Sequence, residues 1–415
     1  MQCYGCYRKD IDGYCPNCRK RLFDGHRVHR VLPLDRPKAD NMVQFQEKTK
    51  CLSISGVQLK YSLKRDGKDL TLVDKGGTYI LKPIPPSTQL VNREQAPENE
   101  HLTMQIATQI FDIGTAQNGL IYFRDGTPSY LTRRFDVNPS GGKFQQEDMA
   151  QLSGRSQKTH GETFKYDGTY EEIGQMIQKY VAAYPPALEQ FFRIVVFNYL
   201  FSNGDAHLKN FSLIQATTGE YTLSPAYDLI CTVLHTPLES DTALDLYPGS
   251  MDSPFYSSFG FYGQADFRIL ADKLGIVPVR RDRILTQLLS ATDQVMQMID
   301  HSFLNDSTKE KYKYAFREKL VRMGMTKAMI GKVINERFPG VYAPTTELIK
   351  LTDLDRKELV GYFDHTAMSD HLEKENQYTF IEGHNSGNYQ STKDSKYITI
   401  VNGDLITRME YLRQE

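Results

Sequence analysis

One polar loop in the middle of the chain constrains the fold more than any other stretch. The segment FSNGDAHLKNFSLI (201–214) is followed, after a turn and a strand pattern, by YTLSPAYDL (221–229). The preceding helical pattern has apolar residues at three- and four-residue spacings, namely Leu188, Phe191, Phe192, Val195 and Tyr199. A buried helix therefore leads into a loop rich in hydrogen-bond acceptors, and a strand pattern leads to a second acidic residue.

The side chains of this loop are those that phosphoryl transfer requires. That reaction needs a carboxylate to accept a hydroxyl proton and oxygen ligands that hold Mg²⁺ against phosphates. Asp205 can supply the first role, and Asn210, five residues later, and Asp228 the second. His207 and Lys209 can face the phosphate, with Lys209 offsetting developing charge. Taken alone, an Asp and an Asn in a turn more often cap backbone groups, so the upstream sequence must decide.

The upstream elements occur in the order that a small kinase lobe requires. They are strand patterns in CLSISGVQLKYSL (51–63) and TYILKP (78–83), an amphipathic helix in NEHLTMQIATQIFDIG (99–114) and a strand in SYLTRRFDV (129–137). We expect Lys82 to contact the α and β phosphates of ATP and Glu100 to orient it as an ion pair. The alternatives are a solvated lysine at a strand end and a first-turn carboxylate favoured by the helix dipole.

Four of the six cysteines form a separate cluster near the N-terminus. Cys3, Cys6, Cys15 and Cys18 have the spacing C-x2-C, eight residues, C-x2-C, and CPNC carries a turn-forming Pro-Asn pair. This pattern predicts a tetrahedral structural zinc site, because four thiolates leave no open position for catalysis. A segment this small would take its folding free energy from the metal. The alternative is four reduced cysteines on a flexible arm.

Charge and hydropathy exclude some classes of function. The chain has 50 Lys and Arg against 51 Asp and Glu, so no global field draws it to nucleic acid or an anionic membrane. No apolar run reaches the roughly 18 residues of a membrane-spanning helix, and MQCYGCYRKD lacks the apolar stretch of a secretory signal. We therefore expect a cytoplasmic protein with no membrane partner.

Several blocks together resemble the HipA family of toxin kinases of type II toxin–antitoxin systems. They are SISGVQLK, YILKP, NEH, RRFD, QEDM, GDAHLKNFSL and SPAYDL, and they occur in the family's order between about residues 51 and 322. The resemblance implies that Asp205 is the catalytic base, that Asn210 and Asp228 bind Mg²⁺ and that Lys82 binds ATP. Further implied nucleotide contacts are Ser55, Gly56, Val57, Gln58, Leu59, Lys60, Arg133, Arg134, Phe135, His207, Leu208, Lys209 and Tyr227.

The resemblance also implies a function and partners. It implies a Ser/Thr kinase that phosphorylates an aminoacyl-tRNA synthetase, with glutamyl- and tryptophanyl-tRNA synthetases both open, and that is neutralised by a cognate antitoxin. That antitoxin would be a helix-turn-helix protein, which would carry any DNA contact, with a separate protein like the HipA N-terminal subdomain as a further partner. The loop GRSQKTHGETFKYDGTYEEI (154–173) falls where the family has a mobile loop near the protein substrate.

Two departures from the longer family members point to the shorter, HipT-like ones. Only some fifty residues precede the Gly-loop, and they contain the cysteines. The Gly-loop has the two-serine form Ser53-Ile54-Ser55, in which HipT-like kinases are autophosphorylated. The alternative is that these serines are small loop residues chosen for close backbone approach to phosphates.

The predicted fold is α+β, a two-lobed protein-kinase-like architecture. We expect a zinc knuckle at 1–24, a linker at 25–50, a kinase N-lobe at 51–140, a helical C-lobe at 141–324 and an accessory domain at 325–415. Because the cysteines precede the kinase blocks, we expect phosphotransfer not to depend on them. In the accessory domain we expect helices in TKAMIGKVINERF (326–338) and LDRKELVGYF (354–363), and an Asn-Gly hairpin in YITIVNGDLITRM (397–409).

Two rival functions use the same residues. A lipid or small-molecule kinase would need the same metal ligands, and only the extended HipA-like block order favours the protein kinase. A pseudokinase or a DNA-bound corepressor would need no catalysis. The presence of Lys82, Asp205, Asn210 and Asp228 argues against lost catalysis, and the balanced charge argues against strong DNA affinity of this chain alone.

Overall fold

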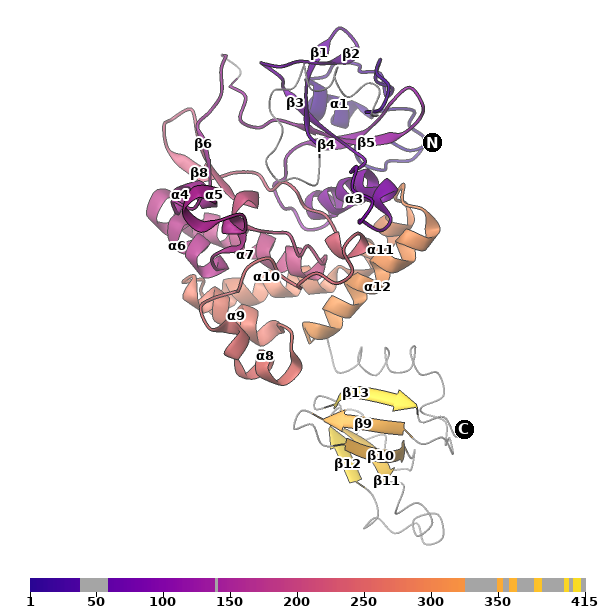
Figure 1. Cartoon of the computed structure of the whole chain (residues 1–415), viewed down its shortest axis with the longest axis vertical. Helices are drawn as coiled ribbons and strands as arrows, with labels where there is room; N and C mark the ends of the chain where they lie inside the picture. The colour runs from indigo at the N-terminus through magenta and orange to yellow at the C-terminus, as the bar shows by residue number, and fades with distance from the viewer. Residues whose placement is uncertain are drawn as a thin grey trace. The chain divides into compact units, whose positions relative to one another are not determined.

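The structure is a computed structural model that describes residues 1–37, 59–138 and 141–324, and the backbone of five strands between 349 and 411. It divides into two compact units (Figure 1). The first unit contains Met1–Pro248 and Arg268–Lys319, and the second contains Gly249–Phe267 and Leu320–Glu415.

The first unit opens with an antiparallel five-stranded sheet of order β2-β1-β3-β5-β4. Its strands are β1 (Tyr61–Asp66), β2 (Asp69–Leu72), β3 (Tyr79–Pro83), β4 (Asn118–Tyr122) and β5 (Pro128–Arg133). The central strand β3 pairs with both β1 and β5, and this pairing places Lys82 opposite Tyr130. A central strand has neighbours on both edges, so its side chains are held in fixed positions.

The N-terminal residues pack against this sheet and share its core. Helix α1 (Pro16–Phe23) is capped at its N-terminus by Cys15 and contributes Leu22 and Phe23 to the core. The remaining buried members are Cys3, Tyr14, Cys15, Cys18, Leu32, Tyr61, Leu63, Leu70, Tyr79, Leu81, Ile121, Phe123 and Leu131. Gly119 in β4 permits the close approach, because a Cβ there would lie 3.1 Å from the Tyr4 carbonyl oxygen. The cysteine segment therefore shares a hydrophobic core with the sheet of the N-lobe.

The first part of the expected linker also belongs to the sheet. Leu32 N–H donates to the Tyr122 carbonyl at 2.7 Å, and Tyr122 N–H donates to the Arg30 carbonyl at 2.9 Å. A parallel bridge joins Val31 to Tyr122 at the outer edge of β4. The sequence is polar here, but β4 is an edge strand with backbone groups that need partners, and this segment supplies them.

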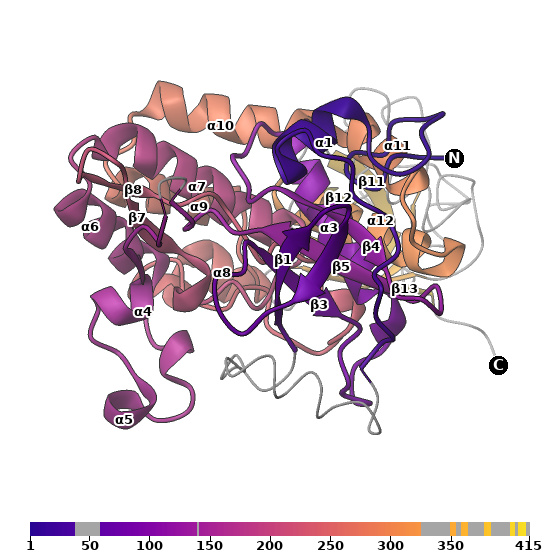
Figure 2. The same ribbon diagram turned by 90° about the horizontal axis from the view of Figure 1, so that it is seen from above.

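Helix α3 (Ala96–Gln109) packs against the sheet, and the helices of the first unit other than α1 and α3 form its second lobe (Figures 1 and 2). Figure 2 shows helices α6 and α7 to one side of strands β1, β3 and β5. These remaining helices are α4 (Met149–Leu152), α5 (Gln157–His160), α6 (Tyr170–Tyr180), α7 (Tyr184–Leu200), α10 (Pro278–Ser290), α11 (Thr292–Asp300), and most of α9 (Gln264–Lys273) and α12 (Asp306–Arg322). Short 3-10 turns are η1 (Arg93–Gln95), η2 (Phe164–Tyr166), η3 (Leu208–Asn210) and η4 (Thr232–Leu234).

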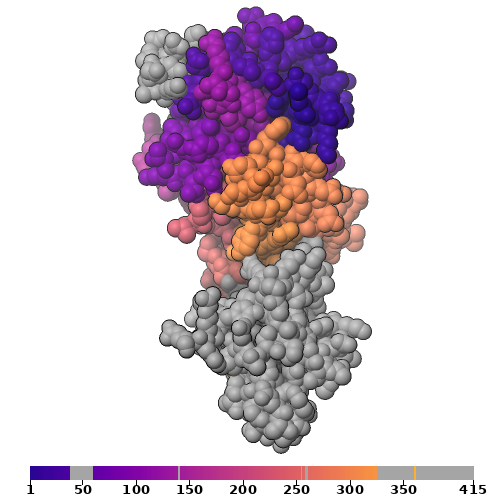
Figure 3. All heavy atoms as spheres, turned by 90° about the vertical axis from the view of Figure 1, so that its right-hand side faces the viewer, coloured from indigo at the N-terminus to yellow at the C-terminus, as the bar shows by residue number. Residues whose placement is uncertain are grey.

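Two aromatic contacts tie the N-terminal segment to the helical lobe. The Phe303 ring, between α11 and α12, lies 5.4 Å from the Tyr4 ring and 5.3 Å from the Tyr7 ring. Tyr7 also contacts the His101 ring of α3 at 5.0 Å. Figure 3 shows the face on which the N-terminal residues (indigo) and the α11–α12 region (orange) meet. The N-terminal segment therefore contacts the sheet, α3 and the helical lobe at once.

A small three-stranded antiparallel sheet carries the polar loop. Its order is β6-β7-β8, with β6 (Gln146–Asp148), β7 (Ser212–Gln215) and β8 (Tyr221–Leu223). Helix α7 is buried along the face predicted from its apolar spacing and ends at Leu200, one residue before the loop begins. The β7–β8 hairpin then returns the chain so that Asp228 lies beside that loop.

In the second unit the structure corrects two expectations about residues 325–415. It has a five-stranded sheet of order β12-β11-β10-β9-β13, built from β9 (Ile349–Asp353), β10 (Glu358–Phe363), β11 (Gln377–Glu382), β12 (Thr399–Asn402) and β13 (Ile406–Tyr411). The helix expected at 354–363 is wrong, because residues 358–363 pair with strands on both sides, and tertiary pairing overrides a short apolar pattern. The unit also contains η5 (Ser250–Asp252) and α8 (Pro254–Phe259).

The expected Asn-Gly hairpin is also wrong. Strand β12 pairs with β11 and β13 pairs with β9, so these two strands lie at opposite ends of the strand order. A local turn signal cannot compete with a longer-range pairing that builds a larger sheet. The helix expected at 326–338 lies outside the described residues.

Within the described parts of the chain, none of the helices is long and apolar enough to cross a membrane.

Candidate active site

The centre of the site is Lys82 on strand β3, whose side chain is only 3% exposed. Its Nζ forms an ion pair with Glu100 of helix α3 and donates to Asp228 Oδ1 at 2.5 Å. Lys60 Nζ lies 3.1 Å from the other oxygen of the same carboxylate. The Tyr130 ring, the cross-strand neighbour of Lys82, lies 5.3 Å from its Nζ. Two lysines and two carboxylates from separate parts of the chain thus meet.

The protonation states of these groups follow from their contacts. Burial alone would lower the pKa of Lys82, but the carboxylates of Asp228 and Glu100 raise it above its ordinary value. Burial would raise the pKa of Asp228, and the two lysines overcome this and lower it. Burial raises the pKa of Glu100, and Lys82 opposes that shift. Lys82 is therefore a cation and Asp228 an anion, as binding of a phosphate and a metal requires.

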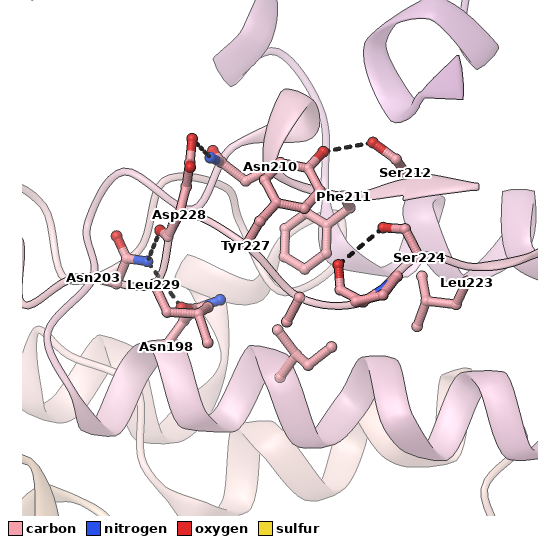
Figure 4. A pocket seen from close by; sticks show the side chains of 13 residues that line it. Asn198, Asn203, Asn210, Phe211, Ser212, Leu223, Ser224, Tyr227, Asp228 and Leu229 are labelled. Carbon is pink, nitrogen blue, oxygen red and sulfur yellow. Dashed lines mark hydrogen bonds between the residues drawn. The ribbon is translucent and has the colours of Figure 1, made fainter. Parts of the chain in front are cut away.

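Asp228 is held on the far side by the polar loop (Figure 4). Asn210 donates its amide to Asp228 Oδ2 at 3.4 Å, and Asn203 donates to the Asp228 carbonyl at 3.3 Å. Asn203 is fixed in turn by Asn198 at the end of α7, at 2.9 Å. Asp228 has a left-handed backbone with φ 56°, a conformation that costs a non-glycine residue energy and is concentrated at functional sites.

Tyr227 joins the loop to the small sheet. Its hydroxyl is 2.5 Å from the Ser212 hydroxyl (Figure 4). The same hydroxyl donates to the Lys209 carbonyl at 2.9 Å. Its ring lies 5.7 Å from that of Phe135 in the segment between the lobes. Because Tyr227 precedes Asp228 directly in the sequence, its hydrogen bonds to Ser212 and Lys209 also restrict the position of Asp228.

Asp205 stands at the open side of the loop, with a side chain 49% exposed. Its Oδ1 accepts a hydrogen bond from the Tyr166 hydroxyl at 2.5 Å. Lys165 Nζ and His207 Nε2 lie 3.9 Å and 3.8 Å from the same oxygen. Burial lowers the pKa of His207 to about 4, so this imidazole is neutral near pH 7.

A second carboxylate near the loop was missed by the sequence reasoning. Glu239 accepts hydrogen bonds from Thr232 and, at 2.7 Å, from Thr236. Thr232 Oγ1 in turn accepts a hydrogen bond, at 2.8 Å, from the N–H of Gly204, the residue before Asp205. Burial raises the pKa of Glu239 to about 6. No local pattern signals Glu239. Lys165 and Tyr166 belong to the loop 154–173, which the family resemblance places near the protein substrate, but their contacts with Asp205 join residues far apart in the sequence.

These residues surround a cavity of about 920 Å³. That is within the range of small-molecule and cofactor sites, about 300–1,000 Å³. The residues expected from the sequence that line it are Lys60, Lys82, Arg133, Arg134, Phe135, Asp205, His207, Lys209, Asn210, Tyr227 and Asp228. The structure therefore brings most of the described expected residues to one cavity.

Other expected residues lie elsewhere. Glu100 is buried behind Lys82, Leu208 is fully buried, and Leu59 packs against the core of the sheet. Arg133 lines the cavity but also forms an ion pair with Asp24, at 2.7 Å. The Gly-loop residues expected at the site that lie outside the described residues are Ser53, Ser55, Gly56, Val57 and Gln58.

The four N-terminal cysteines converge. Their sulfur atoms all lie within 4.8 Å of one another, with Cys6 and Cys15 at 3.7 Å. Sulfurs bound to one tetrahedral zinc at about 2.3 Å are about 3.8 Å apart. Backbone N–H groups of Cys15 and Cys18 donate to the sulfurs of Cys3 and Cys15, as is typical of thiolate ligands. Gly5 is required here, because a Cβ would lie 2.9 Å from the Cys18 sulfur. This donor set fits a zinc ion.

The sequence of this chain matches one protein family and several curated relatives. The family model of the HipA-like C-terminal domain matches residues 52–297. A protein of Haemophilus influenzae named "Putative kinase" is 25% identical over 313 residues, which cover 71% of this chain and 88% of the relative. "Putative kinase Y4dM" of Sinorhizobium fredii is 34% identical over 236 residues, covering 52% of this chain and 54% of the relative.

A solved structure shares the fold. The HipA chain in the complex of Shewanella oneidensis HipA, HipB and operator DNA matches with a TM-score of 0.50 and 20% identity, covering 71% of this chain and 73% of that one. This likeness confirms the expected α+β, kinase-like fold class. Because the family model covers more than half of the sequence, the chain belongs to the HipA family.

Proposed function

We propose that this protein is an ATP-dependent Ser/Thr protein kinase of the HipA toxin type. The observation that carries the proposal is the arrangement around Asp228. Lys82, which is paired with the buried Glu100, lines one nucleotide-sized cavity together with Asn210 and an accessible Asp205. These are the parts that phosphoryl transfer uses, in the order along the chain in which kinases carry them.

The residues divide the work of the reaction. Lys82, oriented by Glu100, binds the α and β phosphates of ATP. Asp228 and Asn210 would hold Mg²⁺, which would stabilise negative charge on the phosphates. Lys60 and Lys82 neutralise the Asp228 carboxylate in this structure. Asp205 takes the proton of the acceptor hydroxyl as its oxygen attacks the γ-phosphorus, and ADP leaves. Lys209 offsets charge on the transferred group.

The proposed acceptor is a serine or threonine of an aminoacyl-tRNA synthetase, and the proposed partner is an antitoxin of the helix-turn-helix type. Two findings support the antitoxin proposal: membership of the HipA family, and the likeness to the Shewanella complex that contains HipA, HipB and operator DNA. The substrate proposal rests on the family resemblance alone. We expect the protein to meet both the synthetase and the antitoxin in the cytoplasm.

The direct test uses purified protein with γ-labelled ATP and a lysate of the host. One labelled band that proves to be an aminoacyl-tRNA synthetase, modified at Ser or Thr, is the expected result. Label on a lipid or metabolite would favour the small-molecule kinase. An absence of label in every fraction, together with operator binding by an antitoxin complex, would favour the corepressor.

We also propose that Ser53 and Ser55 are autophosphorylated and switch the kinase off. A phosphate adds about −1.5 to −2 charge at pH 7 where the ATP phosphates must approach the backbone. Ser53→Asp or Ser55→Asp should therefore raise the KM for ATP and reduce toxicity, while the Ala variants stay active. Mass spectrometry of active wild-type protein after incubation with Mg-ATP should find the phosphate. Unmodified serines in active enzyme would contradict the switch.

We propose further that Cys3, Cys6, Cys15 and Cys18 hold one structural Zn²⁺. The four cysteines pack with the core that strands β1, β3 and β5 share. Tyr7 and the Cys6 carbonyl contact His101 and Gln109 of α3, the helix that carries Glu100. Loss of the metal would loosen both the sheet and this helix, so the expectation that phosphotransfer is independent of the cysteines is replaced by its opposite.

The prediction concerns the double variant Cys3→Ser/Cys6→Ser. Wild-type protein should contain about one zinc per chain by elemental analysis, and the variant none. Its melting temperature should fall by about 10 °C, because metal-binding energy is folding energy, and its kcat should fall with it. Cys51→Ser, outside the cluster, should keep the metal. Wild-type protein without zinc would remove the proposal, and a fully active, metal-free variant would contradict the coupling to α3.

A further inference from the structure

A tyrosine hydroxyl sits on the carboxylate proposed as the catalytic base. Tyr166, at the end of η2, donates to Asp205 Oδ1 at 2.5 Å, and its ring lies edge-on to the His207 ring at 5.2 Å. A general base must have the hydroxyl that it deprotonates within about 2.6–3.2 Å. The phenol therefore makes the contact that an acceptor hydroxyl has to make.

The rest of η2 also lies on the catalytic loop. Lys165 Nζ is 3.9 Å from Asp205 Oδ1, and Lys209 Nζ lies 5.9 Å from the Phe164 ring. All three residues of η2 thus contact groups that the reaction uses. Lys165 and Tyr166 line the same cavity as Asp205. An acceptor segment that approaches Asp205 must pass the place where these side chains now lie.

We propose that Tyr166 occupies the acceptor subsite and that residues 161–168 form a gate, which a protein acceptor must displace. This inference rests on the proposed function, with Asp205 as the base. The acceptor is a flexible protein segment that presents a Ser or Thr hydroxyl, because it must replace both the phenol at Asp205 and the short chain segment that carries it. Free ATP alone leaves the gate closed.

The construction of the segment suits displacement. Glycines stand at both ends, Gly161 with φ 75° and Gly168 with φ 155°, in a region that favours glycine. No residue of η2 is buried, and Tyr166 is 40% exposed, so opening exposes little apolar surface. Arg155 anchors the far end, with ion pairs to Asp167 at 3.6 Å and Glu172 at 2.7 Å. The segment is thus held by polar contacts that an acceptor can replace.

The test measures multiple-turnover ADP formation from Mg-ATP alone, with water as the acceptor. Tyr166→Phe removes the hydroxyl and keeps the ring against His207. It should raise the rate of ADP formation about tenfold, which is what release of one charge-assisted hydrogen bond can supply. The KM for ATP should not change. Hydrogen exchange of the amides of residues 162–167 should become faster.

Tyr184→Phe is the matched control. Tyr184 is 42% exposed, against 40% for Tyr166, and does not line the cavity, so its loss should change neither rate nor exchange. If Tyr166 merely orients Asp205, Tyr166→Phe will slow ADP formation, and the gate is overturned. Phosphate accumulating on Tyr166 would overturn it as well, because the tyrosine would then be an acceptor.

The two proposals fail in different ways. In one outcome, wild type forms ADP faster than Asp205→Asn, but Tyr166→Phe forms it no faster than wild type. This result would refute the gate and leave the proposed kinase function standing. ADP formation equal to the Asp205→Asn background in wild type and in Tyr166→Phe would refute the gate. The proposed function would be refuted as well only if wild type also fails to label any acceptor in the host lysate.

Discussion

Asp228→Asn is expected to abolish phosphoryl transfer, with a loss on the order of 10²-fold or more in kcat. The carboxylate of Asp228 contacts Lys60, Lys82 and Asn210 together. An amide of the same shape keeps the packing and removes that charge, so both metal binding and the position of Lys82 suffer. The measurement is kcat with labelled Mg-ATP, together with the Mg²⁺ concentration that gives half of the maximal rate.

The fold should survive this substitution. Lys82 keeps its partner Glu100, and Lys60 has a side chain 28% exposed that can turn to water. Asp74→Asn, which removes the same charge at an exposed turn between β2 and β3, should keep full activity. Toxicity on expression should vanish with Asp228→Asn and remain with Asp74→Asn. Full activity of Asp228→Asn would sink the assignment of the metal site.

Asp205→Asn is the second prediction with a large expected effect. An amide cannot accept the proton of an attacking hydroxyl, so kcat should fall on the order of 10²-fold or more. The KM for ATP should change little, because Asp205 stands at the open side of the cavity and its carboxylate is paired with Tyr166 rather than with Lys82. ATP affinity measured by calorimetry and kcat measured with labelled ATP separate these two effects.

Its structural consequences should be local. Tyr166 can still donate to the amide oxygen, and the Asp205 side chain is about half exposed, so the melting temperature should stay within a few degrees of wild type. The pair of variants also tells the two carboxylates apart. Asp228→Asn should weaken the response to Mg²⁺, whereas Asp205→Asn should leave it intact. A kinase that keeps its rate in Asp205→Asn has its base elsewhere.

Much of the site could be predicted because its signals are local in sequence. The spacing of Asp205 and Asn210, the strand pattern around Lys82 and the helix pattern around Glu100 are each confined to a short stretch of chain. Local patterns depend on backbone period and turn chemistry, which a single sequence shows. The family resemblance then supplied the roles of these residues.

Other features depended on contacts between distant residues. Strand β10 was expected as a helix, since a short apolar run fits both periods, and only its pairing with β9 and β11 decided the outcome. The Asn-Gly signal at 402–403 failed because β12 and β13 found other partners. Tyr166 and Glu239 reach the loop around Asp205 only through the folded chain.

The sequence by itself determined the family, the kinase-like fold class and which side chains can serve a phosphoryl transfer. Only the tertiary structure decided which parts of the protein the cysteine segment packs against. Its four sulfurs and the residues around them share a core with the sheet that carries Lys82 and contact the helix that carries Glu100. The physical reason is that burial of apolar surface is not directional, so a sequence shows which residues will be buried but not against what.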